Sequence, residues 1–160
     1  EIDETALEKA GGVFFLSQTA NWNKALEIAI PITNHLRSEI NTFTYNDFHY
    51  VNLAISRGSK PMVTLFDFDH SGKGFLESDY MNAASGLKGE ALECFKENTP
   101  VDSERLVLNE FLAILYALIV ASGRDEIPGW AKGLPETIIS ADFTELMEKA
   151  ISILEKRREP

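Results

Sequence analysis

The sequence has little cysteine and a shortage of positive charge. Cys94 is the only cysteine among 160 residues, which excludes an internal disulfide and a zinc site built from several cysteines. Lys and Arg number 15 against 25 Asp and Glu, and the net charge of −10 argues against nucleic acid or an anionic membrane surface as the partner. Cations and basic protein segments are favoured instead. A reducing intracellular compartment suits a single cysteine, either the cytoplasm or an organelle reached after removal of an N-terminal peptide.

Long apolar runs and catalytic constellations are also missing. The longest apolar run, Phe111 to Ala121, is shorter than the ~20 residues that cross a bilayer, so it predicts a buried helix and no membrane insertion. The three histidines are scattered and show no zinc spacing. Cys94 lies in an expected helix and is interpreted as a buried structural thiol. The sequence therefore predicts a protein that is not an enzyme.

One stretch, residues 67–79, does carry the pattern of an ion-binding loop. Oxygen-bearing side chains occupy alternate positions at its start, Gly72 follows to allow a sharp turn, and an acid closes the stretch. Hard cations such as Ca²⁺ take six to eight oxygen ligands from loops of this kind. A register that starts at Asp69 instead would put a lysine at a ligand position, which opposes cation binding. The predicted ligands of a single Ca²⁺ or Mg²⁺ site are Asp67, Asp69, Ser71, the main-chain carbonyl of Lys73, and Asp79.

The end of this stretch recurs along the chain. Four segments share an apolar residue, three spacer positions, an acid and an aromatic residue, and their apolar positions lie 32, 31 and 32 residues apart. Such a period predicts repeated supersecondary units. Helical spacing of apolar residues flanks the segments over residues 22–37, 48–55, 61–66, 90–95, 111–122 and 143–156. The four segments are Phe43–Phe48, Phe75–Tyr80, Leu106–Phe111 and Ile138–Phe143.

This arrangement resembles the EF-hand superfamily over residues 22–157, in the four-hand layout of calmodulin, troponin C and myosin light chains. The resemblance implies an all-α fold of four degenerate helix–loop–helix units arranged as two paired lobes, residues 21–87 and 88–160. Residues 1–20 are expected to be a leader, because Gly11-Gly12 should break a helix there. The three loops other than 67–79 lack early ligands and are interpreted as structural.

The function that follows from the resemblance is a calmodulin-like or light-chain-like binding subunit of a larger assembly. Its partner is expected to be an amphipathic or basic helix held in an apolar groove. The alternative function is a calcium sensor or buffer, in which an ion at residues 67–79 gates partner binding. The candidate docking residues, each of which could instead be ordinary core, are Phe111, Leu112, Leu115, Leu118, Ile119 and Trp130.

Overall fold

The computed structural model describes residues 2–40, 42–48 and 50–157. The chain forms two compact units. Unit 1 combines Glu1–Ser38 with Val107–Pro160, and unit 2 is the intervening segment Glu39–Leu106. This division differs from the expected lobes at 21–87 and 88–160, because the two ends of the chain are brought together in one unit.

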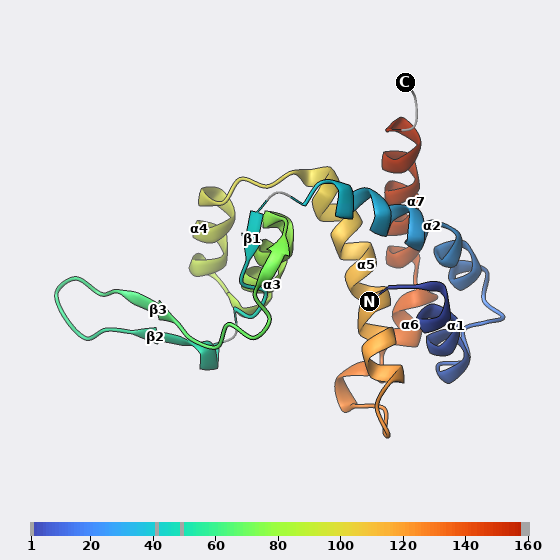
Figure 1. The fold of residues 1–160 in the computed structure, drawn as a ribbon, viewed down its shortest axis with the longest axis horizontal. Helices are drawn as coiled ribbons and strands as arrows, with labels where there is room; N and C mark the ends of the chain where they lie inside the picture. The colour runs from blue at the N-terminus through green and yellow to red at the C-terminus, as the bar shows by residue number, and fades with distance from the viewer. Residues whose placement is uncertain (1, 41, 49, 158–160) are drawn as a thin grey trace. The chain divides into compact units, whose positions relative to one another are not determined.

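The prediction of an all-α fold is wrong. The described residues are 62% helical and contain seven α-helices, but they also contain two antiparallel sheets of two strands each. Both sheets lie in unit 2 (Figure 1). In one of them, formed by residues 53–55 and 63–65, apolar residues alternate with Ala54 and Thr64, which favours strands because side chains at i and i+2 share one face of a strand.

Unit 1 is helical within the part of the chain that the structure describes. Its first helix begins after Asp3, whose carboxylate accepts the N–H of Ala6, and its last begins after Ser140, whose hydroxyl accepts the N–H of Phe143. Both are N-caps that satisfy otherwise unpaired amides. The helices are α1 (Glu4–Val13), α2 (Ala20–Ser38), α5 (Ser103–Ser122), α6 (Leu134–Ile138) and α7 (Ala141–Lys156), with a 3-10 turn at Gly129–Ala131; the first turn of α5 belongs to unit 2.

The expectation that Gly11-Gly12 breaks a helix is wrong, because both glycines lie inside α1. Gly11 is buried against Trp22 of α2, and a Cβ added to it would lie 2.4 Å from the indole Nε1. The glycine therefore lets α1 and α2 approach closely. Within residues 1–20, expected to be a leader, α1 thus forms part of the packed structure of unit 1.

Unit 2 is built on short strands and two helices. β1 pairs with β4 so that Phe43 faces Lys73, and β2 pairs with β3 as a hairpin in which Ala54 faces Thr64. Figure 1 shows the hairpin projecting away from β1 and α3. The elements are β1 (Thr42–Thr44), a 3-10 turn (Tyr50–Asn52), β2 (Leu53–Ile55), β3 (Val63–Leu65), β4 (Gly72–Gly74), α3 (Leu76–Gly86) and α4 (Glu90–Asn98).

The predicted helices are confirmed in four places and wrong in two. Residues 22–37, 90–95, 111–122 and 143–156 lie within α2, α4, α5 and α7. Residues 48–55 and 61–66, expected to be helical, instead contain the β2–β3 hairpin. The four repeated segments do not share one structure, since the third lies within α5 and the fourth spans the end of α6 and the start of α7.

Helix α5 is long and apolar enough to cross a membrane by length and composition alone. Its 18-residue window has a mean hydropathy of 1.7, and 39% of that window is buried inside the structure. The buried positions recur every three or four residues, as in a core helix that presents one face to its neighbours.

Candidate functional site

The predicted ion loop runs from the end of β3 through β4 into the start of α3. Asp67 has a left-handed backbone, with φ of 58°, and its carboxylate accepts the N–H of Asp69 at 3.3 Å. Both carboxylates are exposed. Ser71 is half-buried, and its hydroxyl has no hydrogen-bond partner among the described residues. Lys73 is an exposed strand residue of β4. The structure therefore brings the first two predicted ligands next to each other.

The fifth predicted ligand, Asp79, has a structural task. It lies in the first turn of α3, and its carboxylate accepts the N–H of Asn46 at 2.6 Å and that of Tyr45 at 2.9 Å. Asn46 has a φ of 60°, so Asp79 stabilises a left-handed turn just after β1. We call the contact of Asp79 with these two amides the Asp79 clamp. Asn82 of α3 adds a similar contact, because its side-chain oxygen accepts the N–H of Phe48 at 2.5 Å. The carboxylate thus holds the backbone of one segment against the helix of another.

The described part of the chain contains no group of three or more His, Cys, Asp or Glu side chains placed to hold one metal ion. A Ca²⁺ site needs six to eight oxygens, and Asp79 is already committed to two backbone amides. Ion binding at the five predicted ligands, Asp67, Asp69, Ser71, the carbonyl of Lys73 and Asp79, stays a prediction.

An apolar groove of about 920 Å³ lies in unit 2, beside the predicted ion loop. This volume is within the range of sites that hold ligands, roughly 300–1,000 Å³. The hairpin forms one wall, α3 another, and α4 and the turn after β1 complete the lining. The lining includes Asp47, Phe48, Leu53, Val63, Leu65, Asp79, Tyr80, Ala83, Leu87 and Phe95.

Aromatic contacts hold the walls of the groove together. Tyr80 of α3 stacks on Phe95 of α4, with ring centroids 5.3 Å apart. Tyr45 meets Phe48 and Phe68 edge to face, at 5.0 and 5.3 Å. Such pairs contribute beyond the apolar area that they bury. Two helices and the base of the hairpin are thereby fixed around an apolar space.

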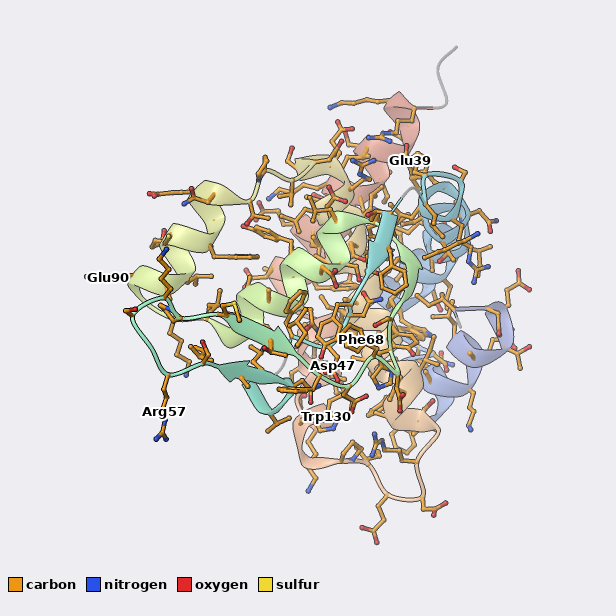
Figure 2. All side chains as sticks on the ribbon, turned by 60° about the vertical axis from the view of Figure 1, so that its left-hand side comes forward. Glu39, Asp47, Arg57, Phe68, Glu90 and Trp130 are labelled. Carbon is orange, nitrogen blue, oxygen red and sulfur yellow. The ribbon has the colours of Figure 1, made fainter. Side chains whose placement is uncertain are left out.

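Tyr45 joins the groove to the ion loop. Its hydroxyl donates to the carbonyl of Phe66, and its ring is buried. Burial, followed by the negative charges of Asp47 and Asp67, raises the pKa of this hydroxyl above its ordinary value. The hydroxyl therefore stays protonated at neutral pH and remains a donor. Figure 2 shows Asp47 and Phe68 together at the base of the hairpin.

The groove carries negative charge among its apolar residues. Asp47 lines it and accepts a hydrogen bond from the side chain of Asn52 at 2.5 Å, and Asp79 also lines it. Across unit 2, eleven Asp and Glu stand against six Lys and Arg. A cationic segment is therefore attracted to this unit, whereas an anionic one is repelled.

A second carboxylate of α3, that of Glu77, also fixes the position of this helix. Glu77 is buried, accepts the N–H of Asp102 at 2.8 Å, and pairs with Arg105 at 3.3 Å. Arg105 also pairs with Glu39 at 3.4 Å. Asp102 in turn caps α5 by accepting the N–H groups of residues 104 and 105. These contacts position the helix that forms one wall of the groove.

The docking residues expected from the sequence belong to unit 1, whereas the lining of the groove comes from unit 2. Four of them are buried in the core, because they occupy the inward face of α5. Ile119 is half-buried, and Trp130 is exposed in a 3-10 turn. The buried four, which are unavailable to a partner in this structure, are Phe111, Leu112, Leu115 and Leu118.

Comparison with protein-family models, with curated proteins and with solved structures found no match. The EF-hand resemblance therefore rests on the sequence motif alone. The sequence motifs do not predict the groove, because its lining residues come from segments far apart in the chain. A signal was present, since Leu53 and Ile55, and Val63 and Leu65, alternate with small or polar residues on either side of a Gly-containing turn.

Proposed function

We propose that this protein is a non-enzymatic binding subunit that holds a basic amphipathic helix of a partner protein in the groove of unit 2. The observation that carries the proposal is an apolar groove of about 920 Å³ with the carboxylates of Asp47 and Asp79 in its lining. An amphipathic helix presents apolar side chains at i, i+3, i+4 and i+7 to such a groove. Lysine and arginine on its flanks complement the acidic charge of the unit.

The groove walls support binding without a large rearrangement. The Tyr80–Phe95 stack and the Asp79 clamp fix α3 against α4 and against the turn after β1. A preformed site loses less conformational entropy when it is occupied than a site that must first order. The apolar lining supplies affinity, and the two carboxylates select the charge of the partner.

The test uses two fluorescent helical peptides with the same apolar face, one with lysine flanks and one with glutamate flanks. Fluorescence anisotropy should show the lysine peptide binding the full chain at least tenfold more tightly than the glutamate peptide. The affinity of the lysine peptide should fall as the salt concentration is raised. Equal binding of the two peptides, or binding of neither, contradicts the proposal.

Two matched pairs of variants locate the site. Ala83→Phe fills the groove and should weaken the lysine peptide by about tenfold or more, whereas Ala91→Phe on the exposed surface of α4 should not. Asp47→Asn removes one lining charge and should weaken binding severalfold, while Glu97→Gln removes an exposed charge outside the lining. Equal effects within a pair would place the peptide elsewhere.

A second candidate function is an ion-gated version of the same binding. One observation favours it. Among the described residues the half-buried Ser71 hydroxyl has no hydrogen-bond partner, and the nearby residues Asp67 and Asp69 of the same loop are exposed. Calorimetric titration with Ca²⁺ and with Mg²⁺ decides whether an ion binds. If chelator and the double variant Asp67→Ala, Asp69→Ala leave the peptide affinity unchanged, binding is constitutive. If both abolish it, the ion gates the groove.

A further inference from the structure

The β2–β3 hairpin has an apolar face that is only half used within its own unit. In the observed register Leu53 faces Leu65 and Ile55 faces Val63, so these four side chains share one face of the hairpin. Leu53, Leu65 and Val63 line the groove. Ile55 lies beyond it, and the outer pair, Ile55 and Val63, is 68% and 64% exposed. The apolar lining of the groove therefore continues along the hairpin into solvent.

The far end of the hairpin is basic, in contrast to the net negative charge of the chain. Residues 56–62 contain Arg57 and Lys60 and no acid, within a chain of net charge −10. Figure 2 shows Arg57 at this end, with its side chain pointing away from the strands. Next to the basic tip, Met62 is 68% exposed. The hairpin end thus combines exposed apolar side chains with positive charge, which is the chemistry that the groove selects.

We propose that a second copy of this chain docks on this surface, so that each hairpin end covers the groove of the other copy. The apolar ends meet an apolar groove, and Arg57 and Lys60 approach an acidic unit. Because hairpin and groove form one continuous surface, a twofold axis satisfies both halves at once and closes the assembly as a dimer. A single hairpin end would bury little surface for a stable interface. Reciprocal docking doubles the buried area, because both hairpin ends and both grooves take part.

The inference rests on the proposed function. In the dimer the hairpin of one copy occupies the groove in which the partner helix would bind, so the dimer regulates that binding. Self-association and partner binding should then compete. Peptide that binds the groove shifts the dimer to monomer, and dilution of the protein raises the apparent peptide affinity. An anionic bilayer is the less favoured occupant, because the net charge of −10 repels it.

Analytical ultracentrifugation of the full chain tests the proposal. From about 1 to 200 µM the mass should rise from the 17.9 kDa of one chain towards twice that value and no further, and added salt should oppose the rise. A monomer throughout this range overturns the proposal. Growth into larger assemblies overturns its reciprocal geometry, because a contact that does not close builds open chains.

Matched variants connect the dimer to the hairpin. Arg57→Glu with Lys60→Glu should weaken dimerisation by about tenfold or more, whereas the same reversal at exposed Arg124 and Lys132 of unit 1 should leave it unchanged. Ile55→Thr with Val63→Thr keeps the β-branched shape and should also weaken the dimer, with Ile139→Thr as its control. A dimer that survives both hairpin variants, or that is lost equally in the controls, overturns the proposal.

Two further readouts separate the hypotheses. Peptide binding by a chain that never dimerises overturns this inference and leaves the proposed function standing. A dimer sensitive to the hairpin variants, in a chain that binds neither peptide, overturns the proposed function and retains the self-docking. Monomers that bind phosphatidylserine vesicles, and lose that binding in the Arg57→Glu, Lys60→Glu variant, would assign the hairpin to a bilayer and overturn the dimer.

Discussion

Buried apolar side chains fill unit 1, whereas Tyr45 is the one apolar side chain buried in unit 2 among the described residues. Unit 2 buries polar side chains instead, namely Thr44 and Glu77, and it leaves a groove open beside them. The first unit is therefore stabilised by its own core, and the second by hydrogen bonds, ion pairs and a few aromatic contacts. A partner that binds only the folded form of unit 2 would add to its stability by mass action.

The largest expected effect comes from the core of unit 1. Phe111 is fully buried and stacks on Phe143 with ring centroids 5.7 Å apart. Phe111→Ala should lower the free energy of unfolding by about 3–5 kcal/mol, because it removes apolar contacts and leaves a cavity. Chemical denaturation followed by circular dichroism measures the loss. Tyr116→Ala on the exposed side of the same helix is the control, and an equal loss there would contradict this picture of α5.

A smaller effect is expected where α1 meets α2. Gly11→Ala should cost about 1–3 kcal/mol, since its Cβ would overlap the Trp22 indole. Gly12 is the matched control in the same helix, because a Cβ there meets no atom of the described residues within 4 Å. Gly12→Ala should be neutral or stabilise by up to ~1 kcal/mol through helix propensity. Thermal melts measure the stability of the two variants. A Gly12→Ala variant less stable than the Gly11→Ala variant would refute the close approach of α1 and α2 at Gly11.

In unit 2 the sharpest change is at the Asp79 clamp. Asp79→Ala leaves the amides of Tyr45 and Asn46 without their acceptor and should cost about 1–2 kcal/mol locally. Hydrogen exchange should show faster exchange at residues 42–48 and unchanged protection in α7 of unit 1. Asp69→Ala, which removes an exposed carboxylate from the same region, should leave both segments unchanged. Equal effects of the two variants would count against the clamp.

The smallest effect concerns a surface ion pair on α7. Glu145 and Lys149 approach to 2.7 Å, and Lys149 holds the pKa of the Glu145 carboxyl below its ordinary value. Since the folded pKa is the lower one, this pair stabilises the fold above the ordinary pKa of glutamate, and the contribution is lost as the pH falls through the lowered value. Lys149→Gln should return the pKa of Glu145 towards its ordinary value in an NMR titration. High salt should shrink the difference between variant and parent.

Local spacing was enough to predict the helices whose apolar residues recur every three or four positions, such as α2 and α7. It failed for the hairpin, because Phe48, Val51 and Ile55 satisfy a helical spacing while Leu53 and Ile55 satisfy a strand spacing. What decides between them is pairing with residues 63–65, which no short window contains. The acid–aromatic repeat misled for a related reason, since equal spacing in sequence does not impose equal packing.

The candidate site was predicted only in part. The stretch 67–79 does border the groove, and its last residue does hold the structure together, but through backbone amides. Gly74 in this stretch has a role that the sequence pattern does not reveal. A Cβ on it would lie 2.6 Å from the hydroxyl oxygen of Thr44 in the neighbouring strand, so this position is needed for close strand pairing. Such a requirement appears only once the two strands are seen together.

The lone thiol of Cys94 has a practical consequence for all of these measurements. The prediction that this thiol is buried is wrong, because Cys94 is exposed on α4. It directly precedes Phe95, which lines the groove, and it is the only cysteine of the chain. A maleimide dye would therefore label every molecule at one known place, without mutagenesis. Because Cys94 is absent from the lining of the groove, the label would leave the lining residues unchanged, and a dye next in sequence to Phe95 offers a fluorescence signal for docking in unit 2.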